Sequence, residues 1–128
     1  MEENIVVTQE KGTKEKCYRI IQEIVVARDK HCQAPFCYQP ADCGHHTFKR
    51  DRLATAFNPD VVIGMCTQHH TGFCHNKPKQ FKEFMINRLG EERYYALRRQ
   101  SYTNVDHPDY NEIYQGLVKV LRAYRRGA

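Results

Sequence analysis

Apolar residues recur at helical spacing near both ends of the chain. Within residues 14–28 they fall on one stripe, the pattern of an amphipathic helix: Cys17, Ile20, Ile21, Ile24 and Val25. The same period predicts three helices in the C-terminal half: one from about residue 76 that ends at Gly90, one over residues 91–100, and one that follows Pro108. Helices are therefore expected at both ends of the fold.

The middle of the chain has a different pattern, which predicts two short strands. Residues 60–65 (DVVIGM) are rich in β-branched side chains and follow the turn signal Asn58-Pro59. Residues 45–48 (HHTF) are the expected partner strand, across the polar loop KRDRLATAFNPD. A further helix is expected to begin at Cys66. Strand, loop, strand and helix, with helices on either side, predict an α+β fold.

Length and composition indicate one globular domain. The chain has 128 residues, of which 41% are hydrophobic and 27% charged, as is usual for that class. We divide it into an N-terminal helix (1–30), a central core (31–76) and a helical tail (77–128). The first sixteen residues contain an apolar run of only three. We therefore predict neither a signal peptide nor a membrane anchor, and we expect a cytoplasmic protein with no membrane partner.

The formal net charge of +5 is concentrated in the tail. Residues 1–76 carry nine Lys and Arg against nine Asp and Glu, whereas residues 77–128 carry eleven against six. A basic half with interleaved aromatic residues favours a polyanionic partner such as nucleic acid. Solvated helix faces would give the same pattern, so charge alone leaves both interpretations open.

Cysteine and histidine cluster in the central core. Five of the six cysteines and five of the seven histidines lie between positions 32 and 76. In a reducing cytosol such cysteines are more often metal ligands than disulfides. Cys32-x4-Cys37 precedes the first strand, and Cys66-x2-His69 lies where the second strand turns into a helix. This two-plus-two pattern predicts a closed, tetrahedral, structural zinc site whose binding contributes to folding.

Several histidines remain outside that zinc site. His70 directly follows His69, so on a helix its side chain points about 100° away and faces something else. Alternate strand residues face opposite sides, so only one of His45 and His46 points straight at His70. A purely structural interpretation is also open, in which these histidines bind a second zinc.

Cys43 and Cys74 are the cysteines that such a second zinc would use. Small buried residues are the simpler interpretation of both. His75 fits a phosphate contact or a solvated helix residue equally well. Lys49, Arg50 and Arg52 lie in the loop between the two strands, so they are the first candidates for phosphate contacts.

Together these residues resemble the HNH, or ββα-metal (His-Me finger), endonuclease superfamily, and most of all the NinG (Rap) family of phage recombination proteins. The resemblance runs from Cys32 to about Tyr124 and includes DCGHHTFKR, LATAF and the tail FKEFMINRLGEERYYALRRQS. It implies an α+β fold with a small zinc-stabilised ββα-metal (HNH) core and flanking N- and C-terminal α-helices. It also implies a metal-dependent DNA endonuclease in phage or bacterial recombination, phage-encoded or in a bacterial host, that acts on branched or single-stranded DNA. Cutting both strands of a junction would favour a homodimer.

The resemblance assigns roles to individual residues. Four match the structural zinc ligands: Cys32, Cys37, Cys66 and His69. His69 stands where relatives have cysteine, and the first pair is two residues wider than the usual Cys-x2-Cys. A catalytic Mg²⁺ or Mn²⁺ would be held by His45 and His70, and His46 would be the general base. Aligning on Gly-His makes His45 the base instead.

The chemistry gives independent reasons for these residue types. Phosphodiester hydrolysis needs a water nucleophile, a base to take its proton and a cation that stabilises charge on the phosphate. Histidine suits the base because its ordinary pKa lies near neutral pH. A hard divalent ion on few protein ligands leaves coordination positions for phosphate, although two imidazoles shift the preference toward Mn²⁺, Ni²⁺ or Zn²⁺.

The chain departs from the family at one position. Relatives carry an asparagine five residues before the third zinc ligand, which braces the general base, and here that position is Val61. Either Asn58 has taken over this role or the site is weakened. Together with the surplus cysteines, Val61 favours an alternative function, a zinc-stabilised, non-catalytic DNA-binding recombination accessory protein.

Overall fold

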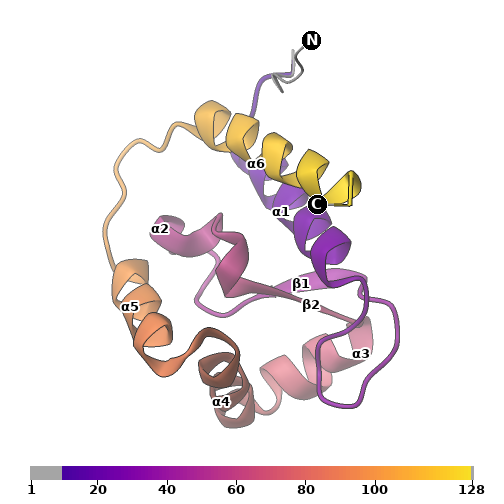
Figure 1. Ribbon diagram of the computed structural model, residues 1–128. Coiled ribbons are helices and arrows are strands. Elements are labelled where there is room, and N and C mark those ends of the chain that lie inside the picture. Colours follow the sequence, from indigo (N-terminus) through magenta and orange to yellow (C-terminus); the bar gives the residue numbers. More distant parts are fainter. Residues whose placement is uncertain (1–9, 128) are drawn as a thin grey trace.

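The computed structural model describes residues 10–127, so part of the N-terminal segment considered above lies outside the described residues (Figure 1). The elements are, in order, α1 (Lys14–Asp29), β1 (Cys43–His46), α2 (Leu53–Ala56), the 3-10 turn η1 (Pro59–Val61), β2 (Val62–Met65), α3 (Thr67–His69), the π-helix η2 (His70–His75), α4 (Pro78–Leu89), α5 (Glu91–Ser101) and α6 (Tyr110–Arg125). The two strands form one antiparallel sheet. The α+β prediction is thus confirmed. Within residues 10–127 no helix combines the length and the apolar character needed to cross a membrane.

The N-terminal helix forms as its apolar stripe predicts. Thr13 caps α1 by accepting a hydrogen bond from the amide of Lys16 at 3.2 Å. All five residues of the predicted stripe are buried. They belong to one buried cluster that also takes in β2, Phe81 of α4 and Leu117 of α6. In Figure 1, α6 lies along α1, and the hairpin lies beneath them.

Both strands are shifted from their predicted positions. In the structure Cys43 pairs with Met65 and His46 with Val62, so β1 begins two residues earlier than expected. The start of the second predicted strand forms η1 instead. Pro59 has no amide hydrogen to give to a sheet, and the Asn58 side chain accepts from the amide of Asp60 at 2.9 Å, which favours a tight turn.

Both edges of the hairpin are held by α1. The amide of Gly64 on β2 donates to the carboxylate of Asp29 at 2.8 Å, and the amide of Gly44 on β1 donates to the side chain of Gln22 at 2.6 Å. Burial raises the pKa of Asp29. Hydrogen bonds from Arg28 and the Gly64 amide, together with nearby arginine charges, lower this pKa by more than burial raises it, so the net shift is downward. The carboxylate is therefore ionised at neutral pH.

The segment after β2 departs most from expectation. The helix expected from Cys66 begins one residue later, at Thr67, with Cys66 as its N-cap. It then continues as a π-helix, in which the amide of Asn76 donates to the carbonyl of Thr71 at 3.0 Å. The next helix then starts at Pro78, two residues later than expected, because proline suits the first helical position. Gly90 ends that helix with a φ of 91°, as predicted.

Candidate metal centres

The structure brings the four predicted zinc ligands together. Two come from the loop after α1, one from the N-cap of α3 and one from the end of α3: Cys32, Cys37, Cys66 and His69. Their ligand atoms all lie within 4.8 Å of one another. His69 Nδ1 is 3.3 Å from Cys66 Sγ and 3.7 Å from Cys32 Sγ. A tetrahedral zinc would separate neighbouring sulfur and nitrogen ligands by about 3.6 Å. This Cys3His cluster could therefore hold a metal such as zinc.

The local fold explains the wide spacing of the first two cysteines. The amide of Cys32 donates to Gln39 O at 2.8 Å, which closes the loop, and the amide of Cys37 donates to Ala34 O at 3.1 Å. The chain turns back at Phe36, whose φ is 64°. This turn absorbs the two extra residues between the cysteines, so both thiols reach the same point.

The protonation of the thiols also favours a cation. Burial raises the pKa of the Cys66 thiol. Hydrogen bonds from the amides of His69 and Gln68 and from neighbouring thiols lower this pKa by more than burial raises it, so the net shift is downward. Burial raises the pKa of Cys32 to about 11. The free protein thus favours the thiolate form more at Cys66 than at Cys32. A bound metal would compensate the charge of both, with release of protons.

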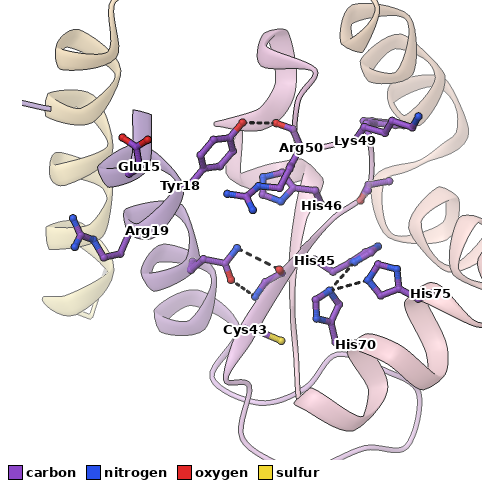
Figure 2. Close-up of a pocket in the computed structure, with 14 residues that line it drawn as sticks. Glu15, Tyr18, Arg19, Cys43, His45, His46, Lys49, Arg50, His70 and His75 are labelled. Carbon is purple, nitrogen blue, oxygen red and sulfur yellow. Dashed lines mark hydrogen bonds between the residues drawn. The ribbon is translucent and has the colours of Figure 1, made fainter. Parts of the chain in front are cut away.

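A second cluster consists of three imidazoles. His45 of β1 faces His70 and His75 of η2, and the three ring nitrogens lie within 4.8 Å of one another. His70 Nε2 is 3.1 Å from His45 Nδ1 and 3.3 Å from His75 Nε2, the contacts drawn as dashed lines in Figure 2. Imidazoles on one metal ion would have adjacent nitrogens about 2.9 to 3.4 Å apart. These distances fit a shared cation.

Hydrogen bonding alone explains this cluster poorly. His70 Nε2 meets both of the other nitrogens, and a ring nitrogen carries either one proton or one lone pair. It can therefore form only one good hydrogen bond of the two. Burial, followed by the charges of the other histidines, lowers the pKa of His45 to about 4. The neutral imidazole that results is the form that binds metals.

His75 belongs to this cluster because of the π-helix. In an α-helix, side chains five positions apart point about 140° away from each other, so helical spacing does not pair His70 with His75. The wider π-helical turn bonds residues five apart and brings both imidazoles to one side. His75, first considered for DNA contact, thus lies with two expected metal ligands.

His46 faces the opposite side of β1, as strand alternation requires. Its Nε2 lies 2.9 Å from the carbonyl of Ala56. A carbonyl only accepts, so Nε2 carries the proton and Nδ1 keeps its lone pair in the neutral ring. Burial lowers the pKa of His46 despite the opposing hydrogen bond to Ala56. Asn58 does not contact His46; its side chain bonds to the amide of Asp60.

One cavity of about 780 Å³ connects these features. It is lined by the three imidazoles of the cluster and by His46, together with Lys49 and Arg50. Figure 2 shows these side chains around one opening. The Arg50 guanidinium lies 4.0 Å over the Tyr18 ring, and the Tyr18 hydroxyl donates to Arg50 O at 2.6 Å. Arg52 lies elsewhere, over the ring of Tyr102.

Cys43 and Cys74 belong to neither cluster. Cys43 Sγ donates to Met65 O at 3.3 Å, and Cys74 is 4% exposed. Burial raises the pKa of the Cys43 thiol to about 11 and that of the Cys74 thiol to about 12. Both are therefore protonated thiols, Cys74 buried and Cys43 half-buried.

The hydroxyl of Thr47 is buried beside the three imidazoles and has no hydrogen-bond partner among residues 10–127. Thr47 is two positions after His45, on the same side of the strand, and both line a cavity of about 330 Å³ with His75. A buried hydroxyl without a partner destabilises a fold. The buried position of the Thr47 hydroxyl is explained if a molecule bound at the three imidazoles supplies the missing hydrogen-bond partner.

Replacement of Thr47 by valine is expected to stabilise the protein by about 1 kcal/mol, because the unpaired hydroxyl is removed at nearly constant shape. Thr55→Val is the matched control, since the Thr55 hydroxyl is buried and bonds to Arg52 O at 3.5 Å. This second change should lower stability. Urea unfolding of both variants measures the difference. A less stable Thr47→Val protein would show that the hydroxyl has a partner.

Comparison with known proteins gives no match to a family model, a curated protein or a solved structure. The comparisons therefore support neither the HNH resemblance nor any other family assignment.

Proposed function

We propose that this chain is a metal-dependent DNA endonuclease of the HNH type. The observation that carries this proposal is that the three-imidazole cluster and His46 line one cavity. The three imidazoles lie at metal-binding distances, and His46 has a free ring nitrogen. The order of β1, β2 and α3, with ligands on β1 and after β2, is what the resemblance to HNH enzymes implies. The zinc-binding loop stands before it, as in that resemblance.

The residues present fit a divalent cation. His45, His70 and His75 would hold it, and the buried hydroxyl of Thr47 lies beside them. A bound cation would supply the positive charge that stabilises the phosphate in the transition state. Three imidazoles favour Mn²⁺, Ni²⁺ or Zn²⁺ over Mg²⁺, which prefers oxygen ligands.

His46 is the proposed general base. The carbonyl of Ala56 fixes the proton on Nε2, so the Nδ1 lone pair can accept a proton from water. The water oxygen then attacks phosphorus, the bond from phosphorus to the 3′ oxygen breaks, and that oxygen takes a proton from solvent. The proposal takes His45 as a metal ligand, in preference to the alternative in which His45 is the base.

Arg50 and Lys49 are the proposed phosphate contacts. Stacking on Tyr18 holds the Arg50 guanidinium in one orientation, which reduces the entropy lost on binding a phosphate. Both cations line the cavity that contains the histidines. The branched or single-stranded DNA substrate, the role in phage or bacterial recombination and the homodimer rest on the resemblance.

A cleavage assay tests the proposal. Zinc-loaded protein is incubated with supercoiled, single-stranded and four-way-junction DNA, each with Mg²⁺, Mn²⁺ or Ni²⁺. Cleavage that requires the added metal and stops with a chelator is the expected result. A folded protein that binds Mn²⁺ or Ni²⁺ but cuts none of these substrates would contradict it.

A second candidate function is a zinc-stabilised, non-catalytic DNA-binding recombination accessory protein. Val61, which stands in place of the family's asparagine, is fully buried at 0% exposure, and Asn58 does not reach His46. This interpretation predicts DNA affinity that falls steeply with salt and no exchangeable metal. Metal analysis before and after dialysis separates the two functions.

A further inference from the structure

The outer edge of β1 is bound by a side chain instead of a third strand. Each strand of a two-stranded sheet has one unpaired edge. On that edge of β1, Gly44 N donates to Gln22 Oε1 at 2.6 Å and Gln22 Nε2 donates to Gly44 O at 3.3 Å. The carboxamide of Gln22 thus satisfies both backbone groups that a neighbouring strand would otherwise bind.

The absence of a side chain at Gly44 allows this contact. A Cβ at position 44 would lie 2.7 Å from Val25 Cγ2 and 2.9 Å from Val62 Cγ1, which is too close for any other residue. The helix α1 therefore packs directly on the strand backbone. Because the helix is this close to the strand, the glutamine side chain, with two methylene groups between Cα and the carboxamide, reaches both backbone groups of Gly44.

The position bound by Gln22 lies next to a proposed metal ligand. Gly44 immediately precedes His45, which is the one imidazole of the cluster that does not come from η2. The distance of 3.1 Å between His45 Nδ1 and His70 Nε2 depends on how β1 lies relative to η2. Metal ligands need to be held to about 0.5 Å, and the carboxamide of Gln22 restrains the strand at the adjacent residue.

We propose that Gln22 is a positioning residue for the three-histidine metal site: its two hydrogen bonds to Gly44 hold His45 at ligand distance from His70 and His75. The inference rests on the proposed function in one respect, because these histidines must bind a metal. It makes α1, which the resemblance does not cover, a functional part of the site.

The test is a titration of zinc-loaded protein with Co²⁺, followed by calorimetry and visible absorption. Gln22→Leu removes both hydrogen bonds at similar volume, and Gln22→Met does so with a more flexible side chain if the leucine variant fails to fold. Gln80→Leu, at an exposed position of α4, is the matched control. We expect Co²⁺ binding about tenfold weaker in the Gln22 variants, as for other partners that orient metal ligands, and unchanged in Gln80→Leu.

The outcomes separate this inference from the proposed function. A purely structural role for Gln22 would lower the melting temperature and leave the Co²⁺ affinity of the folded variant within twofold of the parent, which would overturn the inference. Parent protein that binds Co²⁺ but cuts no DNA would overturn the proposed function and leave the comparison of affinities valid. Parent protein that binds no Co²⁺ beyond its zinc would overturn both.

Discussion

Removal of the metal from the Cys3His cluster is expected to unfold the protein. The cluster joins the loop after α1 to α3 and its N-cap, and Cys32 and Cys66 are themselves part of the buried core. Structural zinc contributes an apparent ~10–16 kcal/mol at neutral pH, about as much as the whole stability of a small protein, ~5–15 kcal/mol. Far-UV circular dichroism during titration with a strong chelator measures the loss, and added zinc should reverse it.

Cysteine variants test the same expectation without a chelator. Cys66→Ala should lose its zinc equivalent and its cooperative unfolding transition. Cys74→Ala is the control, because Cys74 is equally buried but outside the cluster; it should keep one zinc and lose about 1 kcal/mol of stability. If Cys74→Ala also loses zinc, or Cys66→Ala keeps it, the ligand assignment is wrong.

Single histidine variants are expected to separate metal binding from proton transfer. His46→Ala should keep the metal affinity of the parent and lose cleavage by about 10²- to 10⁴-fold, since only the base is removed. His70→Ala should lose metal affinity and cleavage together. His75→Ala should behave like His70→Ala, because η2 presents both imidazoles to one point.

The measurements are Mn²⁺ titration and single-turnover cleavage of one DNA substrate. His107→Asn is the control, an exposed histidine at a φ of 53°, a conformation that asparagine tolerates. Free imidazole should partly restore cleavage in His46→Ala and not in His70→Ala. Normal Mn²⁺ affinity with weakened DNA binding in His75→Ala would return that residue to the phosphate contact expected from the sequence.

The helices and the Cys3His cluster could be predicted because their signals are local. The stripe of α1 runs over about two turns, and Gly90 and Pro78 mark helix ends by their own backbone limits. The two-plus-two ligand pattern needs only that each pair lies near a turn. The spacing of Cys32 and Cys37 is wider than usual, but the two thiols meet as predicted because the loop between them turns back at Phe36.

The second cluster was predicted only in part because it depends on distant contacts. Strand and helix geometry left open whether His45 or His46 faces His70, and only the family resemblance paired His45 with His70. The π-helix that adds His75 has no known signature in these residues. The carbonyl that orients His46 belongs to Ala56, whose side chain gives no chemical signal. The contact of Gln22 with Gly44 depends on how closely α1 packs on the hairpin, which no local pattern encodes.

The π-helix η2 also has a consequence for the spacing of ligands. In an ordinary α-helix, histidines four positions apart share one face, whereas here they are five apart and still converge. The π-helical pitch thus brings together two imidazoles that an α-helix would point about 140° apart. Removal of Gly72, beside which a Cβ would meet no other atom within 4 Å, would leave the two imidazoles four apart and on one face of an α-helix. A spacing of four on an α-helix and a spacing of five on a π-helix are therefore both compatible with this arrangement of imidazoles. A search for histidine pairs at a spacing of four alone would miss the pair in this chain.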